Sequence, residues 1–155
     1  MKYLILGAGP AGVRAAEALR QADPQGEITL VGNEAGAPYA RMAIPYVLAG
    51  HIDDAGALQR RDVGHFERLR VRYRHGCALR VHAGAEAGSV DFDDGSTLPY
   101  DRLLVATGSS PVLPPFPGTG LPGVVTCWTL DDAHAIAARL GPGRRVVLVG
   151  AGFVA

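Results

Sequence analysis

The apolar and polar positions at the start of the chain predict a strand, a helix and a second strand in quick succession. Residues 3–6 form an apolar run without alternation, which is typical of a parallel strand buried on both faces. From Pro10 onward apolar residues recur at helical spacing until Asp23-Pro24 ends the pattern. A second apolar run at residues 28–31 completes a unit with the size of one βαβ crossover. We therefore predict an α/β fold with a Rossmann-like parallel sheet.

The middle of the chain predicts shorter elements. Residues 37–50 are irregular and then apolar, which indicates a loop leading into a short helix, and a second helix is expected around residues 62–70. Residues 69–74 alternate apolar with basic side chains, as a half-exposed strand does. No aromatic residues are interleaved on the arginine face, so we interpret its arginines as solvated rather than bound to nucleic acid. Short strands around Asp94-Gly95 predict a β-hairpin, which adds a β-meander to the fold.

The last third of the chain starts a second unit. Residues 103–106 predict another buried strand, and five prolines between residues 110 and 123 predict a stiff, extended connection. Thr129 and Asp132 have the spacing of a capping box for a helix through Leu140, and residues 146–149 predict a further buried strand.

These patterns divide the chain into three parts. We predict a first nucleotide-binding domain over residues 1–110, a Pro/Gly-rich connection over residues 111–123, and the truncated start of a second Rossmann unit over residues 124–155.

Composition narrows the classes of protein. The 155 residues are 48% hydrophobic and carry 15 basic and 15 acidic side chains, which allows a packed core but no global field for nucleic acid or an anionic membrane. The apolar run at the N-terminus is too short for a signal peptide and no stretch is long enough to span a membrane, so we predict a soluble, cytoplasmic protein. Cys77 and Cys127 lack disulfide or metal-site spacing, and we expect both to be buried small hydrophobes without a metal.

The glycine-rich turn after the first strand is the strongest chemical signal. Gly7, Gly9 and Gly12 form a G-x-G-x-x-G pattern between a predicted strand and a predicted helix, with Pro10 and Ala11 at the helix start. Gly7 permits the tight turn, Gly9 lets a pyrophosphate approach the backbone, and Gly12 lets the helix pack closely on the strand.

The acidic residue of a dinucleotide site is also in place. Glu34 follows the second strand at the distance that this motif requires, where its carboxylate can accept hydrogen bonds from ribose hydroxyls. A structural turn with an exposed glutamate is the alternative.

A second glycine motif, Gly150-x-Gly152, follows residues 146–149. Two such motifs suggest two dinucleotides, and a chain that binds both most simply moves a hydride from nicotinamide to flavin. The alternative is that this half-motif binds nothing, because no helix follows it within the 155 residues.

Together these residues resemble the FAD-dependent pyridine nucleotide-disulfide oxidoreductases, in the branch of NADH oxidases, ferredoxin and rubredoxin reductases and nitrite reductase large subunits. The resemblance covers essentially the whole chain. It rests on both glycine motifs with Glu34, on Pro38-Tyr39-Ala40-Arg41, and on Ala106-Thr107-Gly108 followed by prolines.

The resemblance implies roles for individual residues. Glu34 would bind the FAD ribose, Arg41 would lie along the diphosphate, and Leu79 would place backbone near the adenine. Ala106, Thr107 and Gly108 would close over the cofactor at the end of their strand, where open α/β sheets bind ligands. NAD(P)H would be the hydride donor.

Two departures from the family concern the flavin side of the site. Where NADH oxidases carry a redox cysteine, this chain has Met42, and a thioether forms neither a thiolate nor a mixed disulfide. Electrons would therefore leave the flavin directly. Pro45-Tyr46 replaces the Ser-Lys of many ferredoxin reductases.

The family also has a whole NAD(P)-binding domain, a return segment that completes the FAD site, and an interface domain, none of which lies within these residues. We therefore expect this chain to hold the adenosine-diphosphate half of the site but to bind FAD poorly and to turn over slowly or not at all.

Other candidate residues receive structural interpretations. None of the five histidines pairs with a Ser or Cys nucleophile in a recognisable motif, so we expect surface or capping roles for His51, His65, His75, His82 and His134. Trp128, just before the last predicted helix, could touch a nicotinamide domain or staple that helix to its neighbour, and we favour the staple.

The resulting hypothesis is an FAD-dependent NAD(P)H oxidoreductase, represented by its N-terminal portion. It would pass electrons to a redox protein or a small acceptor, with neither nucleic acid nor membrane as partner, and a homodimer is compatible with it. The alternatives are a non-catalytic nucleotide-binding module left by truncation and an NAD-dependent dehydrogenase. A dehydrogenase is disfavoured because one nicotinamide site does not explain two glycine motifs.

Overall fold

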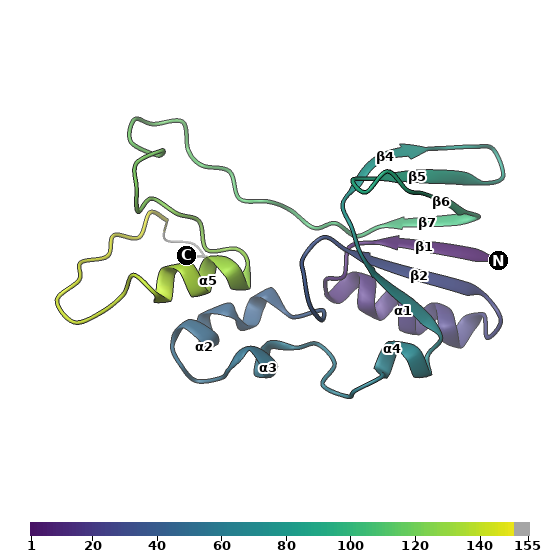
Figure 1. The fold of residues 1–155 in the computed structure, drawn as a ribbon, viewed down its shortest axis with the longest axis horizontal. Coiled ribbons are helices and arrows are strands. Elements are labelled where there is room, and N and C mark those ends of the chain that lie inside the picture. Colours follow the sequence, from purple (N-terminus) through teal and green to yellow (C-terminus); the bar gives the residue numbers. More distant parts are fainter. Residues whose placement is uncertain (151–155) are drawn as a thin grey trace.

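A four-stranded parallel sheet is the centre of the computed structural model, which describes residues 1–150 (Figure 1). Its strand order is β3-β2-β1-β7. The strands are β1 (Lys2–Leu6), β2 (Glu27–Gly32), β3 (Val71–His75) and β7 (Arg102–Val105). All three neighbouring pairs are parallel. The predicted α/β class and the first βαβ unit are confirmed.

Helix α1 (Pro10–Ala22) covers one face of this sheet (Figure 1). Alternate side chains of a strand point to opposite faces, so Ile5 and Leu30 meet Val13 and Ala16 of the helix, and all four are fully buried. Burial of this apolar surface is the main force that holds α1 against β1 and β2.

A three-stranded antiparallel sheet covers the opposite face of the parallel sheet. Its order is β4-β5-β6, with β4 (Ala78–His82), β5 (Gly88–Phe92) and β6 (Thr97–Tyr100). Leu4 and Leu6 pack here against Val90 and Phe92 in the second core cluster. The predicted hairpin is confirmed, and Gly95 has the positive φ of +79° that its turn requires.

The expectation that the arginines of the edge strand β3 are solvated was only partly correct. Arg72 is exposed, but Arg74 lies over the Phe92 ring at 4.3 Å and donates hydrogen bonds to Asp94 and Ser96 at 2.8 and 2.7 Å. Arg74 therefore ties the hairpin to the parallel sheet.

Short helices fill the segment between β2 and β3. They are the 3-10 helix η1 (Arg41–Ala43), α2 (Ile44–Leu48), α3 (Asp54–Ala57) and α4 (His65–Arg68). The loop leading into a short helix is confirmed. The helix expected over residues 62–70 is a single turn, because Gly64 and Arg70 adopt left-handed φ values of +74° and +50° on either side of it.

The strand predicted at residues 103–106 is present as β7 but is not buried. Leu104 and Val105 are 40% and 59% exposed, because β7 pairs only with β1 and forms the edge of the described sheet. The prediction of burial was wrong for that reason.

Helix α5 (Leu130–Ala137) begins with the predicted capping box. The Thr129 hydroxyl accepts a hydrogen bond from the Asp132 N–H, and the Asp132 carboxylate accepts one from the Thr129 N–H. The helix ends before Leu140. The backbone then turns toward Gly141-Pro142, where the proline disfavours a helical residue before it.

Residues 146–149 do not form the predicted buried strand. Their four side chains are between 62% and 84% exposed, and no strand of the described residues lies beside them. A strand needs a partner for its backbone hydrogen bonds, and an apolar run alone cannot provide one.

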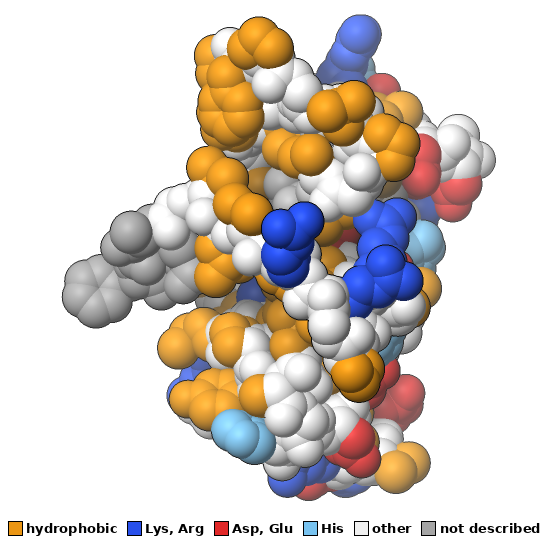
Figure 2. Space-filling view, turned by 90° about the vertical axis from the view of Figure 1, so that its left-hand side faces the viewer, with side chains coloured by type: hydrophobic (Ala, Val, Ile, Leu, Met, Phe, Trp, Pro, Cys, Tyr) orange, Lys and Arg blue, Asp and Glu red, His pale blue; other side chains and the backbone are white. Residues whose placement is uncertain are grey.

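Hydrophobic side chains gather on the face of the molecule that carries this part of the chain (Figure 2). Exposed apolar residues between β7 and residue 150 include Val112, Leu113, Phe116, Leu121, Val124 and Val125.

Cys77 and Cys127 are exposed, contrary to the expected burial. Cys77 lies directly before β4, and Cys127 lies in the irregular segment before α5. Among residues 1–150, no helix has the length and apolar character needed to cross a membrane.

Candidate functional site

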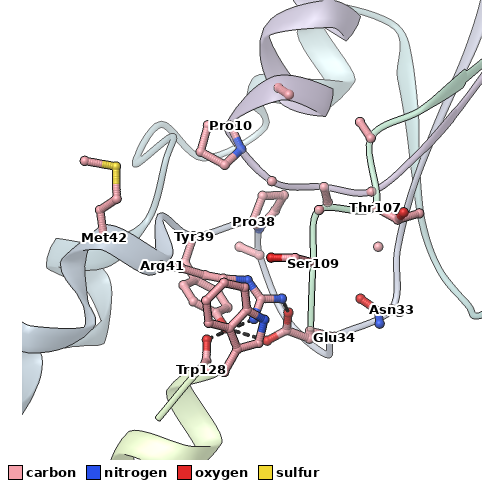
Figure 3. Close-up of a pocket in the computed structure, with 18 of the residues that line it drawn as sticks. Pro10, Asn33, Glu34, Pro38, Tyr39, Arg41, Met42, Thr107, Ser109 and Trp128 are labelled. Carbon is pink, nitrogen blue, oxygen red and sulfur yellow. Dashed lines mark hydrogen bonds and ion pairs between the residues drawn. The ribbon is translucent and has the colours of Figure 1, made fainter. Parts of the chain in front are cut away.

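A cleft of about 310 Å³ lies at the carboxyl ends of β1, β2 and β7 (Figure 3). This end of an open parallel sheet is where α/β proteins bind ligands, because the strand-to-helix turns leave a crevice there. The cleft is lined by residues of five segments: Gly7, Ala8, Gly9, Pro10, Ala11; Gly32, Asn33, Glu34, Ala35, Ala37, Pro38, Tyr39, Arg41, Met42; Tyr73; Ala106, Thr107, Gly108, Ser109; and Trp128.

Close backbone contacts leave no room for a side chain at two glycines of the turn after β1. Gly7 has a φ of +109°, and a Cβ added there would lie 2.1 Å from the Ala106 carbonyl oxygen. A Cβ at Gly12 would lie 1.8 Å from the Gly7 carbonyl oxygen. Only glycine lets β1, β7 and α1 approach so closely.

Gly9 has a different role from its neighbours. A Cβ added there would meet nothing within 4 Å, and its φ of −71° is accessible to any residue. The turn itself therefore does not need a glycine at this position. The open space lies beside the N-terminus of α1, so a glycine here keeps the backbone approachable from the cleft.

The N-terminus of α1 offers an anion site to this open space. Gly9 is the N-cap and makes no side-chain cap, and Pro10 occupies the first turn. The first N–H groups of a helix have no partner within the helix, and the helix dipole places partial positive charge on them. The donor set and the space beside Gly9 fit the diphosphate of a dinucleotide.

Glu34, just beyond β2, is the acidic group at the other end of the cleft. Its carboxylate accepts one hydrogen bond from the Tyr39 hydroxyl and one from the Arg41 guanidinium, which also forms an ion pair with it. The side chain of Glu34 stays 31% exposed. Burial raises the pKa of Tyr39 to about 12, and the hydrogen bond to Glu34 is the second largest cause of this increase. The phenol is therefore a hydrogen-bond donor at neutral pH.

The start of α5 completes this wall of the cleft. Arg41 Nη1 donates to the Trp128 carbonyl oxygen at 2.9 Å, and the guanidinium lies 5.1 Å from the Trp128 ring centroid. The Leu130 N–H donates to the Tyr39 hydroxyl oxygen at 3.1 Å. Trp128 thus packs on the η1 segment, in agreement with the predicted staple, and also faces the cleft (Figure 3).

The sequence model of the pyridine nucleotide-disulphide oxidoreductases matches residues 1–155. The chain belongs to this family. The family inferred from the motifs is therefore confirmed.

Curated relatives are similar along nearly the whole chain. The epsilon subunit of NADH-dependent phenylglyoxylate dehydrogenase from Aromatoleum evansii is 37% identical, over 99% of this chain and 36% of that protein. The ferredoxin-NAD(+) reductase component of the anthranilate 1,2-dioxygenase system from Burkholderia cepacia is 39% identical, over 98% of this chain and 37% of that protein.

A solved structure has the same fold. The ferredoxin reductase for the CYP199A2 system from Rhodopseudomonas palustris superposes with a TM-score of 0.80 at 27% identity, over 89% of this chain and 34% of that one. The chain therefore spans little more than a third of the length of the relatives that it matches.

Most residues predicted for the family site lie in the one cleft. Gly12 does not line the cleft, but it permits the close contact with the Gly7 backbone described above. Leu79 lies on β4, also outside the lining, and is 67% exposed. Gly150 lies in the exposed segment after residue 149, and Gly152 lies outside the described residues. Met42 lines the cleft and is 84% exposed.

Gln59 is a site residue that the sequence analysis did not find. Its amide nitrogen donates to the carbonyl oxygens of Ala8 at 3.1 Å and Tyr39 at 3.0 Å, so it joins the glycine-rich turn to the segment that carries Tyr39 and Arg41. No local pattern marks a glutamine for this task, because its partners lie 51 and 20 residues away.

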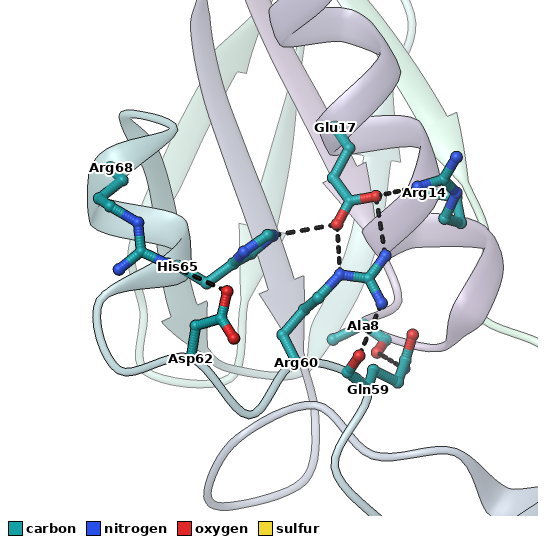
Figure 4. Close-up of polar contacts among 8 residues, drawn as sticks. All are labelled: Ala8, Arg14, Glu17, Gln59, Arg60, Asp62, His65 and Arg68. Atoms are coloured by element: carbon teal, nitrogen blue, oxygen red, sulfur yellow. Dashed lines mark hydrogen bonds and ion pairs between the residues drawn. The ribbon is translucent and has the colours of Figure 1, made fainter.

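A buried carboxylate acts on Gln59 through Arg60, which donates a hydrogen bond to the Gln59 carbonyl oxygen at 2.6 Å (Figure 4). Glu17 on α1 accepts two hydrogen bonds from Arg60, at 2.6 and 2.8 Å, and contacts His65 at 3.0 Å and Arg14. The Glu17 side chain is only 8% exposed, and its hydrogen bonds, first of all those from Arg60, lower its pKa from 4.5 to about 2. This cluster fixes the segment before β3 against α1.

The surface or capping role expected for His65 was wrong, because its side chain is only 18% exposed and pairs with Glu17. The other four histidines, His51, His75, His82 and His134, are exposed, as expected from the sequence. His82 pairs with Asp91 at 2.6 Å and His134 with Asp54 at 3.0 Å, and both histidine side chains are about half exposed.

Replacing Gln59 with methionine should loosen the glycine-rich turn. Methionine has a similar length but no donor, so two partly buried carbonyl oxygens lose their partner, which costs about 1–2 kcal/mol in unfolding free energy. Urea unfolding measures this loss, and amide exchange at Ala8 and Gly9 should quicken. Gln21→Met, at an exposed position of α1, is the matched control. Equal stability of the two variants would contradict the assigned role.

Proposed function

We propose that this chain is the FAD-binding, N-terminal portion of an NAD(P)H-dependent flavoprotein reductase. The observation that carries the proposal is a single cleft with an uncapped helix N-terminus beside Gly9 at one end and the carboxylate of Glu34 at the other. These are the two groups that hold the diphosphate and the ribose of an adenine dinucleotide.

Each end of the cleft has a distinct task in this proposal. The N–H groups at the start of α1 hold the diphosphate, and Glu34 accepts hydrogen bonds from the ribose hydroxyls. Arg41 is ion-paired with Glu34 and so belongs to the ribose end of the cleft in this proposal, while its expected place along the diphosphate stays a prediction. Ala106, Thr107 and Gly108 border the cofactor from the end of β7. Bound FAD supplies a two-electron acceptor for the hydride of NAD(P)H.

Electrons leave the flavin without a protein thiol in this proposal. Met42 replaces a cysteine at the cleft, and neither Cys77 nor Cys127 lines it. The acceptor is a redox protein or a small molecule, and the names of relatives that are ferredoxin reductase components favour a ferredoxin-type protein. The homodimer, the cytoplasmic location and the division at residues 110 and 123 stay predictions.

A non-catalytic nucleotide-binding module is the second candidate. It is favoured by the exposed, irregular course of residues 146–149, where the second glycine motif would need a strand. In this candidate the 155-residue chain binds an adenine nucleotide at Gly9 and Glu34 but does not react with NAD(P)H.

Titration with nucleotides tests both candidates. We expect the purified chain to bind FAD and ADP saturably and with similar affinity, because the cleft holds mainly the adenosine-diphosphate half. FAD fluorescence anisotropy follows binding, and ADP should displace FAD. NAD has the same adenosine-diphosphate half, so it should displace FAD no better than ADP does. Clearly stronger displacement by NAD than by ADP would favour a dehydrogenase, and absence of binding by FAD and ADP would refute a nucleotide site. Reduction of bound FAD by NADH would support the reductase and refute the non-catalytic module.

A further inference from the structure

We infer that Tyr39 is a positioning residue for the ribose-binding carboxylate of Glu34, and that the start of α5 is part of the same nucleotide site. The inference rests on the proposed function and adds to it a residue that acts through Glu34. It also extends the site to residues 128–130, which follow Tyr39 by some 90 positions.

The hydrogen bonds that the protein makes to Glu34 leave one acceptor site on each carboxylate oxygen for the two hydroxyls of a ribose. Tyr39 donates to Oε2 and Arg41 donates to Oε1, so each carboxylate oxygen has one protein partner. A carboxylate has about four acceptor sites, which leaves one on each oxygen. With 31% of its side chain exposed to the cleft, Glu34 can accept both hydroxyls of one ribose while its protein partners stay in place.

Tyr39 and Arg41 are in turn held by the backbone before and at the start of α5. The Tyr39 oxygen accepts the Leu130 N–H at 3.1 Å and Arg41 donates to the Trp128 carbonyl at 2.9 Å. Asp132 fixes this short segment, because its carboxylate accepts the N–H groups of Trp128 and Thr129 at 2.9 and 3.0 Å. The rotamer of Glu34 is therefore set before a nucleotide arrives, which reduces the entropy lost on binding.

Binding of ADP and 2′,3′-dideoxy-ADP to Tyr39→Phe and to the unchanged chain tests this inference. The variant keeps the ring and removes only the hydroxyl. We expect calorimetry to give about five- to tenfold weaker ADP binding to the variant, within the range of one ordinary net hydrogen bond, because Tyr39 acts on the ribose only through Glu34. Binding of dideoxy-ADP should weaken clearly less, because that nucleotide has no hydroxyls for Glu34. Tyr46→Phe, at a 57% exposed tyrosine of α2, is the matched control.

The outcomes separate this inference from the proposed function. Equal weakening of both nucleotides would make Tyr39 a purely structural residue, and no change in either would also overturn the inference, while ADP binding itself would leave the proposed function intact. Failure of the unchanged chain to bind ADP would refute the proposed function and the inference with it.

Fluorescence tests the part played by residues 128–130. Trp128 is the chain's single tryptophan, so its emission reports this segment alone. In Tyr39→Phe, which loses the bond from Leu130, acrylamide should quench Trp128 more strongly than in the unchanged chain or in Tyr46→Phe. Identical quenching in all three would show that Tyr39 does not hold the segment and would overturn its inclusion in the site.

Discussion

Alanine at Gly7 is expected to lower the free energy of unfolding by more than about 3 kcal/mol, which is a large share of the roughly 5–15 kcal/mol of a typical domain. The Gly7 backbone has a φ of +109°, which strains any residue with a Cβ. The new Cβ would also lie 2.1 Å from the backbone oxygen of Ala106, so β1 and β7 would have to separate at their carboxyl ends. Urea unfolding followed by circular dichroism measures the loss.

Gly9→Ala, two residues further along the chain, is the matched variant. It should keep its stability but lose nucleotide binding. With a φ of −71° and no atom within 4 Å of the new Cβ, the change should alter stability by less than about 1 kcal/mol. Binding of ADP and FAD should fall at least about tenfold, since the methyl group occupies the approach to the N-terminus of α1. If Gly7→Ala unfolded at the same urea concentration as Gly9→Ala, the geometry of the turn would be refuted.

Glu17→Gln is expected to remove about 3 kcal/mol of stability at neutral pH, together with the part of the acid sensitivity of the fold that comes from Glu17. The pKa of Glu17 falls from 4.5 to about 2 on folding, so the ionised carboxylate stabilises the folded state above pH 4.5. That contribution is lost as the pH falls from 4.5 to about 2, because in this range the unfolded chain takes up a proton at Glu17 while the folded chain does not. Glutamine does not titrate, so the variant should lack this part of the pH dependence.

Urea unfolding at a series of pH values between 7 and 2 measures this effect. Other carboxylates also lose stabilising contacts in acid, so the difference between the variant and the unchanged chain isolates Glu17. Glu67→Gln, at an exposed position of α4, is the control and should keep the stability and pH profile of the unchanged chain. Parallel profiles for Glu17→Gln and the unchanged chain would contradict the role of the cluster with Arg60 and His65.

The sequence alone determined the elements whose cause is local. The helical period after Pro10, the turn at Asp94-Gly95 and the Thr129–Asp132 capping box each depend on residues within a few positions of one another, and all three are present in the structure. The glycine-rich turn and Glu34 were found in the same way, because both ends of a dinucleotide site lie within one βαβ unit.

Only the tertiary structure decided which apolar runs are covered and what surrounds Glu34. Residues 103–106 and 146–149 have similar patterns, yet the first are in an edge strand beside β1 and the second lack a neighbouring strand among the described residues. Gln59 reaches the turn from 51 residues away, and Leu130 reaches Tyr39 from 91. Burial and long-range hydrogen bonds depend on which segments meet, and no short stretch of sequence contains that information.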